Sequence, residues 1–175
     1  MRLVKEIDKQ AILIAVHEQY RLNWRGIHGV EHWARVMYNG LLLAEHVDAD
    51  PRVVTLFALF HDACRFNDGH DPQHGSRGAA LALSLRGKLF DLEDQAMDLL
   101  HDACCRHTHG LTEADVTVQV CWDADRLDLE RVGITPSPRY LCTEQAKLED
   151  VIHRACLRAC ANEHPDCLPD LARYS

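Results

Sequence analysis

The chain has 175 residues and a formal net charge of −8 at pH 7. This length suits one domain with a full hydrophobic core, and the acidic balance argues against a surface that coats nucleic acid. Neither an apolar run of about 18 residues nor a signal-like N-terminus is present in the sequence, so we expect a cytoplasmic protein with no membrane span.

Apolar residues recur at helical spacing along most of the chain, and no stretch alternates convincingly as a strand would. Asp50 and Pro51 suit the cap and first residue of one helix, and Thr112 with Asp115 resembles a capping box at another. The segment ITPSP is expected to be extended, because the residue before a proline avoids the helical region. The predicted fold class is all-α, one domain over residues 1–175, with helices at 3–20, 29–46, 51–65, 75–86, 92–107, 113–131 and 139–163.

The chain contains eight cysteines, and no two of them have the CxxC spacing. Most of them fall in helical, half-apolar stretches. We therefore expect reduced, mostly buried thiols rather than a framework of disulfides.

The adjacent pair His61-Asp62 lies near the end of an apolar helical run, Pro51 to Arg65 (PRVVTLFALFHDACR). An imidazole and a carboxylate are costly to bury there unless something pairs with them, and a metal ion stabilises both groups. Two further candidate ligands are His32, in HGVEHWARV, and Asp125, in CWDADRLDL. Because neighbouring residues cannot point the same way from a helix, the ion is expected at the helix edge, near its C-terminal turn.

The ordered set His32, His61-Asp62 and Asp125 resembles the HD superfamily of metal-dependent phosphohydrolases, over about residues 28–133. The resemblance implies an HD-domain helical bundle of about six to seven helices. It also implies a metal-dependent phosphohydrolase that uses a metal-activated water on a nucleotide or other small phosphorylated metabolite. Two imidazoles and two carboxylates suit a divalent ion, namely Mn, Fe, Co, Ni, Zn or Mg, and the absence of a thiolate favours a site with open positions.

The polar loop FNDGHDPQHG leaves the metal-bearing turn directly, so we expect it to form one wall of the substrate pocket. In the superfamily an acidic residue in this region often positions the attacking water, and Asp68 and Asp71 are both candidates for this catalytic role. Arginines would supply charge complementary to a phosphate. The residues expected to bind the substrate are His28, Arg35, Arg65 and Arg77.

Some superfamily members hold two ions, with extra histidines between the HD pair and the last aspartate. His74 and His107 are the candidates here, with Asp62 bridging the two ions, and His109 competes with His107. The spacing from His61 to His74 is shorter than in the two-metal subgroup, so the number of ions stays open.

Two other functions are compatible with the sequence. An HD-type mixed-valent di-iron oxygenase would need both extra histidines as ligands. A non-catalytic nucleotide-sensing module is less favoured, because all four ligands are present. The N- and C-terminal helices are expected to pack on the recognised core or to build a homodimer contact.

Overall fold

The protein is described by a computed structural model that covers residues 6–163 and 166–169. Within these residues there is no sheet, and the only strand-like contact is an isolated bridge between Arg86 and Phe90. The prediction of an all-α bundle of six to seven helices is therefore confirmed. The elements are α1 (Lys9–His17), α2 (Val30–Ala44), α3 (Pro51–Phe60), α4 (His74–Leu85), α5 (Asp94–Arg106), α6 (Val116–Arg126), the short 3-10 helices η1 (Leu129–Val132) and η2 (Pro138–Tyr140), and α7 (Glu149–Cys160).

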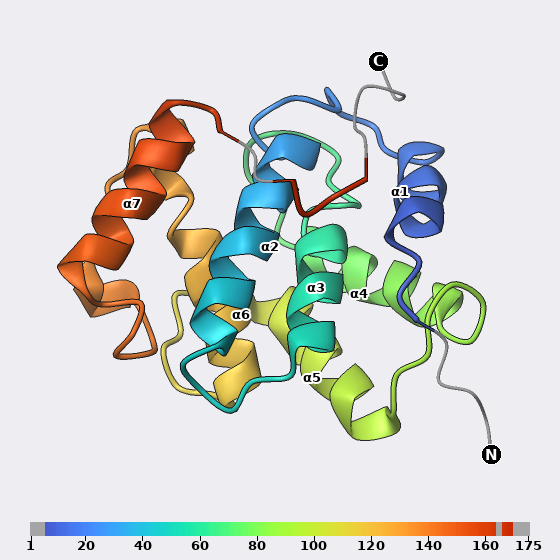
Figure 1. The fold of residues 1–175 in the computed structure, drawn as a ribbon. Coiled ribbons are helices and arrows are strands. Elements are labelled where there is room, and N and C mark those ends of the chain that lie inside the picture. Colours follow the sequence, from blue (N-terminus) through green and yellow to red (C-terminus); the bar gives the residue numbers. More distant parts are fainter. Residues whose placement is uncertain (1–5, 164–165, 170–175) are drawn as a thin grey trace.

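The two helices α2 and α3 lie side by side in the middle of the bundle, between α7 at one edge and α1 at the other (Figure 1). Helix α2 packs against α3 and α6, α3 also packs against α5 and α6, and α4 packs against α5. Large side chains of α2, α3 and α6 fill the space between these helices, and Trp33, Phe57 and Trp122 are fully buried. The centre of the bundle is therefore well packed around the end of α3.

Helix α3 is apolar on nearly all sides, and seven of its ten residues are buried. A helix of this composition belongs in the interior of a protein. Its N-terminus is fixed as predicted, because the Asp50 carboxylate accepts a hydrogen bond from the Arg52 backbone N–H at 2.8 Å and Pro51 takes the first position. His61 and Asp62 directly follow α3, and because α3 is buried, these two residues also lie in the interior.

Helix α4 approaches its neighbours closely through two glycines. A Cβ atom on Gly78 would lie 2.1 Å from the Phe60 carbonyl oxygen at the end of α3, and one on Gly75 would lie 2.0 Å from the Cys104 carbonyl oxygen in α5. Only glycine fits at such a distance. This close packing brings the first residue of α4, His74, against the end of α3.

Several predicted helix boundaries were wrong. Helix α3 ends at Phe60 instead of residue 65, and α6 ends at Arg126 instead of residue 131. Two helices also begin later than predicted, directly after a capping residue. The first helix begins at Lys9 instead of residue 3, and the Asp8 side chain caps it by accepting from the Ala11 backbone N–H at 2.9 Å. Residues 3–5 of that prediction lie outside the described residues. The sixth helix begins at Val116, because Asp115 is itself the cap and accepts from the Thr117 backbone N–H at 2.8 Å.

The predicted helix at 139–163 was wrong in its first part. The Asp123 carboxylate of α6 accepts hydrogen bonds from the backbone N–H groups of Cys142 at 2.6 Å and Thr143 at 2.8 Å. These bonds hold the chain in a loop that passes over α6, and α7 starts only at Glu149.

The sequence also predicted reduced cysteines and no membrane span. All eight cysteines are free, as expected from their sequence context, but the expectation that most of them are buried was wrong, because only Cys104 and Cys121 are. No helix in the described part of the chain combines the length and the apolar character that crossing a bilayer requires.

Candidate metal centre

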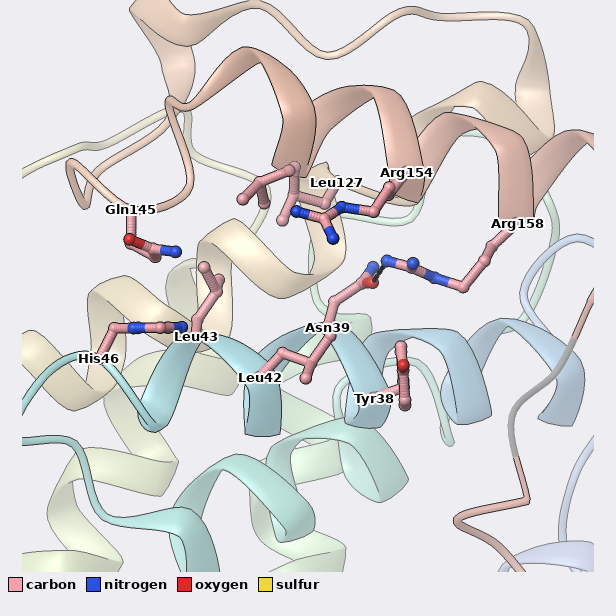
Figure 2. Close-up of a pocket in the computed structure, with 10 residues that line it drawn as sticks. Tyr38, Asn39, Leu42, Leu43, His46, Leu127, Gln145, Arg154 and Arg158 are labelled. Atoms are coloured by element: carbon pink, nitrogen blue, oxygen red, sulfur yellow. Dashed lines mark hydrogen bonds between the residues drawn. The ribbon is translucent and has the colours of Figure 1, made fainter.

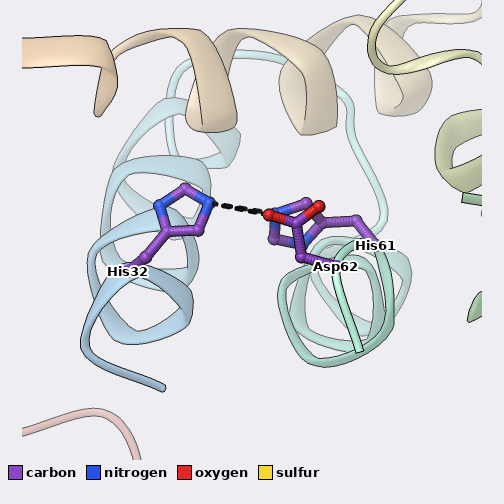
Figure 3. A group of neighbouring side chains, drawn as sticks. All are labelled: His32, His61 and Asp62. Atoms are coloured by element: carbon purple, nitrogen blue, oxygen red, sulfur yellow. Dashed lines mark hydrogen bonds and ion pairs between the residues drawn. The ribbon is translucent and has the colours of Figure 1, made fainter. Parts of the chain in front are cut away.

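Four side chains from three helical segments converge inside the bundle. His32 comes from α2, His61 and Asp62 follow α3, and Asp125 comes from α6. The His32 Nε2 atom lies 3.1 Å from His61 Nε2 and 3.3 Å from Asp125 Oδ1, and Asp62 Oδ2 lies 3.7 Å from each of the two Nε2 atoms. Figure 3 shows the imidazole of His32 facing His61 and Asp62. The structure thus brings the four predicted ligands together, with donor atoms of His61, Asp62 and Asp125 all within 3.7 Å of His32 Nε2.

The hydrogen bonds of the two imidazoles define which ring nitrogen faces the other ligands. His32 donates its Nδ1–H to Asp128 Oδ2 at 2.7 Å, and His61 donates its Nδ1–H to the carbonyl oxygens of Phe57 and Ala58. In a neutral imidazole the other nitrogen then carries a lone pair. Two lone pairs and two carboxylates consequently face one another in a buried space, an arrangement that a cation stabilises.

The spacing of the donor atoms fits a metal ion. Ligand atoms about 2.1 Å from one ion lie about 3.0 Å apart at octahedral angles and about 3.4 Å apart at tetrahedral ones. The donors of His61, Asp62 and Asp125 lie 3.1–3.7 Å from His32 Nε2, and those of Asp62 and Asp125 lie 3.7 and 3.8 Å from His61 Nε2. Two nitrogen and two oxygen donors suit a first-row divalent ion and leave further coordination positions open.

The environment of these groups favours the protonation states that metal binding needs. Burial lowers the pKa of His61 to about 3, against the opposing effect of the Asp62 and Asp125 charges. Burial alone would raise the pKa of Asp62, but its interactions with His61, His107, His28 and His74 hold that pKa well below its usual range. Burial alone would likewise raise the pKa of Asp125, but its interactions with His32 and the nearby imidazoles lower that pKa.

A second group of donors lies on the other side of Asp62. Its Oδ1 atom is 3.2 Å from His74 Nε2 and 3.7 Å from His107 Nε2, and these two nitrogens are 3.0 Å apart. His74 donates its Nδ1–H to the Asp71 carbonyl oxygen, and His107 donates its Nδ1–H to the Cys104 carbonyl oxygen. The three residues form a second buried group that could hold a metal ion.

The competing candidate for this group was His109. It is exposed, whereas His107 is buried and faces Asp62. The geometry therefore places His107 in the second group.

Arg65 lies against the second group. Its Nη1 atom is 3.2 Å from Asp62 Oδ1 and 3.1 Å from His74 Nε2. Its other nitrogens donate to the carbonyl oxygens of Asn67 and Gly69, which fixes the guanidinium in the loop after α3. A positive charge is thus already present where a second ion would be held.

The other predicted substrate-binding residues occupy three different environments. The Nδ1 atom of His28 is 2.8 Å from Asp62 Oδ2, so this residue contacts the centre directly. Arg35 is buried and donates to Asp128 Oδ1 and Asn162 Oδ1. Arg77 donates to Asp71 and to the Cys64 carbonyl oxygen, and its guanidinium lies 3.8 Å from the centre of the Phe66 ring.

The two loop aspartates differ in what their carboxylates contact. Asp71 Oδ2 accepts from the Phe66 backbone N–H at 2.8 Å and from Arg77 Nη2 at 2.5 Å, so it organises the loop. Asp68 is exposed, and its carbonyl oxygen lies 3.3 Å from His28 Nε2.

One residue of the site, Asp128, was not predicted from the sequence. Its carboxylate is buried and bridges His32 and Arg35, with both contacts at 2.7 Å. Such a partner orients a metal-binding imidazole and makes it more basic. One feature of the sequence could have indicated it. Asp128 follows Asp125 by three residues in DADRLD, and residues three apart lie on the same face of a helix.

The comparison with known families now defines the class of this protein. The profile described as HD domain matches residues 29–130, more than half of the chain. The chain belongs to the HD-domain family, within the superfamily of metal-dependent phosphohydrolases. No curated protein and no solved structure matches the chain significantly.

Proposed function

We propose that this protein is a metal-dependent phosphohydrolase that acts on a nucleotide or other small phosphorylated metabolite. The observation that carries the proposal is the buried convergence of His32, His61, Asp62 and Asp125, with both histidine Nε2 lone pairs turned inward. Family membership supports hydrolysis as the class of reaction.

In this proposal the four converging residues hold one divalent ion. Such an ion, when bound, lowers the pKa of a coordinated water toward neutrality and polarises a phosphoryl oxygen. Asp128 keeps His32 in the tautomer that presents Nε2, and Arg35 holds Asp128 in place. Arg35 is thereby assigned to support of the centre, because its guanidinium is engaged inside the protein.

The groups around the centre receive separate roles. We assign orientation of the Asp62 carboxylate to His28 and Arg65, because the Arg65 guanidinium is buried and already donates to Asp62 and to the carbonyl oxygens of Asn67 and Gly69. Asp68 is favoured over Asp71 for positioning the attacking water, because the Asp71 carboxylate is engaged by Arg77 and the Phe66 N–H.

The experiment is a screen of the metal-loaded protein against a panel of phosphorylated metabolites, with released phosphate as the readout. Activity is expected to require the metal, to be lost on chelation and to fall by at least a hundredfold in Asp125→Ala. His101→Ala, which removes an exposed histidine of α5, is the matched control and should keep wild-type activity. Turnover that survives chelation or Asp125→Ala would refute the mechanism.

One observation favours a second candidate, the HD-type di-iron oxygenase. Asp62, His74 and His107 form a second donor group that shares Asp62 with the first. The charge of Arg65 in that group argues against a second ion. Metal analysis after anaerobic iron loading separates the two candidates: two irons per chain would support the oxygenase, and one would exclude it.

A further inference from the structure

A pocket of about 250 Å³ lies between the second half of α2 and helix α7 (Figure 2), and none of the candidate metal ligands is among the residues that line it. Asn39 of α2 points into it and lies seven residues beyond His32, which corresponds to about 10 Å along the helix axis. Leu43 and Leu127 provide part of its apolar lining, and Arg154 and Arg158 of α7 supply its charge. The proposed reaction uses none of these residues.

The charge of the pocket contrasts with that of the whole protein. None of the described residues that line the pocket is acidic, although the chain has a net charge of −8. Arg154 pairs with Asp150 one turn earlier in α7, and both side chains are largely exposed. Exposed pairs of this kind are worth at most about 1 kcal/mol, so Arg154 can exchange its partner for another anion.

Arg158 is held in the pocket but is incompletely satisfied. Its Nη2–H donates to Asn39 Oδ1 at 2.7 Å, and its guanidinium lies 4.9 Å from the centre of the Tyr38 ring. The Nε atom is buried without a hydrogen-bond partner among the described residues. Arg158 also forms no ion pair within the described part of the chain, and burial lowers its pKa. The charges of Asp128 and Glu163 act on Arg158 only from beyond ion-pair distance. A half-buried guanidinium without an ion-pair partner is costly, and a bound anion would offset that cost.

Asn39 and Arg158 are held in position before any ligand binds. The Asn39 amide donates to the Ala124 carbonyl oxygen at 3.3 Å, and this bond turns its Oδ1 atom toward Arg158. Arg158 and Arg154 are four residues apart, so they project from the same face of α7. Two guanidiniums on one helix face, above an apolar floor, make a suitable receptor for an oxyanion carried by a small molecule.

We propose that this pocket is a second ligand site that binds a small phosphate or carboxylate compound between Arg154 and Arg158. Its volume is below the ~300–1,000 Å³ of pockets for drug-sized ligands, so the ligand is a small one. The proposal does not depend on the reaction at the metal centre.

The test is a titration of the metal-loaded protein with inorganic phosphate and, separately, with acetate, followed by NMR of the arginine Nε–H groups. The Arg158 signal is expected to shift on saturation with at least one of the two anions, and the stronger of them identifies the class of ligand. The same titration on the Asp125→Ala variant should still shift Arg158, which separates this site from the metal centre.

Variants make the test decisive. Arg158→Gln is expected to weaken anion binding at this site at least tenfold, and Arg154→Gln at least threefold. Binding is followed by calorimetry in the Asp125→Ala background. Arg139→Gln, which removes an exposed arginine outside the pocket, should bind like the parent protein. Arg154 is exposed, so its variant will fold even if the Arg158 variant does not. An Arg158 signal that neither anion moves, or unchanged binding in Arg154→Gln, would overturn the proposal.

Discussion

The carboxylate of Asp62 contacts both pairs of histidines, one pair through each oxygen. Its Oδ2 atom faces His32 and His61, and its Oδ1 atom faces His74 and His107. A single negative charge is therefore shared between two groups of nitrogen donors. Replacing it should affect metal binding more than replacing any one imidazole would, because no other side chain belongs to both groups among the described residues.

We expect Asp62→Asn to lower the affinity for a divalent ion at least tenfold, because the amide keeps the shape of the side chain but loses the charge. Calorimetric titration of the metal-free variant with Mn²⁺ measures this. Asp102→Asn, on the partly exposed face of α5, is the control and should bind metal like the wild type. Equal affinities in the two variants would show that Asp62 is not a ligand.

Arg65 allows a more specific prediction about the number of ions. Its Nη1 atom lies within 3.2 Å of Asp62 Oδ1 and His74 Nε2, so its charge repels a second cation. We expect the wild type to bind one ion tightly and Arg65→Gln to bind two, as counted by elemental analysis after removal of excess metal. Arg77→Gln is the control, because Arg77 binds Asp71 and the Cys64 carbonyl oxygen instead of the donor group, and it should keep one ion. Two tightly bound ions in the wild type would contradict this account.

At the scale of elements, the position of α4 depends on a close approach to its neighbours. A Cβ atom on Gly78 would collide with the Phe60 carbonyl oxygen, which belongs to the backbone and cannot move aside cheaply. Because His61 follows Phe60 directly, any shift of α4 also disturbs the end of α3. The small residues of α4 thus determine where His74 lies relative to His61.

We expect Gly78→Ala to reduce the free energy of unfolding by roughly 1–3 kcal/mol, the usual cost of overpacking. Although alanine favours a helix more than glycine does, the backbone clash outweighs this gain. Chemical denaturation of the metal-free protein measures the change. The control is Ser76→Ala on the exposed side of the same helix, which should change stability by less than about 0.5 kcal/mol. A Gly78→Ala variant as stable as this control would show that α4 can shift freely.

The elements differ in how far local sequence determines them. The start of α3 was predicted correctly, because Asp50 and Pro51 act within one turn of the helix. The loop between Tyr140 and Glu149 was wrongly predicted as helix, because it is held by Asp123, which belongs to a different helix. Helical periodicity reports on a segment alone, and a bond that joins residues about 20 positions apart leaves no trace in it.

At the scale of the whole molecule, the candidate centre joins α2, α3, α4, α5 and α6 through the side chains that they carry or that follow them. In the metal-free protein, buried carboxylates and imidazole lone pairs face one another across these junctions. A bound ion would therefore stabilise the packing of the bundle as well as complete the site.

Metal should raise the stability of the folded protein in proportion to its affinity. At a free concentration one hundred times the dissociation constant, a ligand that binds only the folded state adds about 2.7 kcal/mol. We expect a clear rise in Tm on addition of Mn²⁺ and its reversal by a chelator. In His61→Ala the rise should be absent, and in His101→Ala it should be as large as in the wild type. A Tm that does not respond to any of the candidate divalent ions would argue against a metal centre.

Much of the candidate site could be predicted from sequence, because order and local context identify His32, His61, Asp62 and Asp125. The second group of donors was also anticipated through His74 and His107. What could not be predicted is which groups pair across the fold. Asp128 and His32 are 96 positions apart, and Arg35 was assigned to the substrate because nothing in the sequence pairs it with Asp128.

The hydrogen bonds that orient the four histidines have a consequence for how the site can change during evolution. Three of the rings donate to backbone carbonyl oxygens three or four residues earlier in the chain, and no mutation of a neighbouring side chain removes those acceptors. His32 alone is oriented by a side chain, that of Asp128. The orientation of these three rings is therefore preserved when neighbouring side chains are substituted. Asp128 is the position at which a single substitution could retune the metal preference without replacing a ligand.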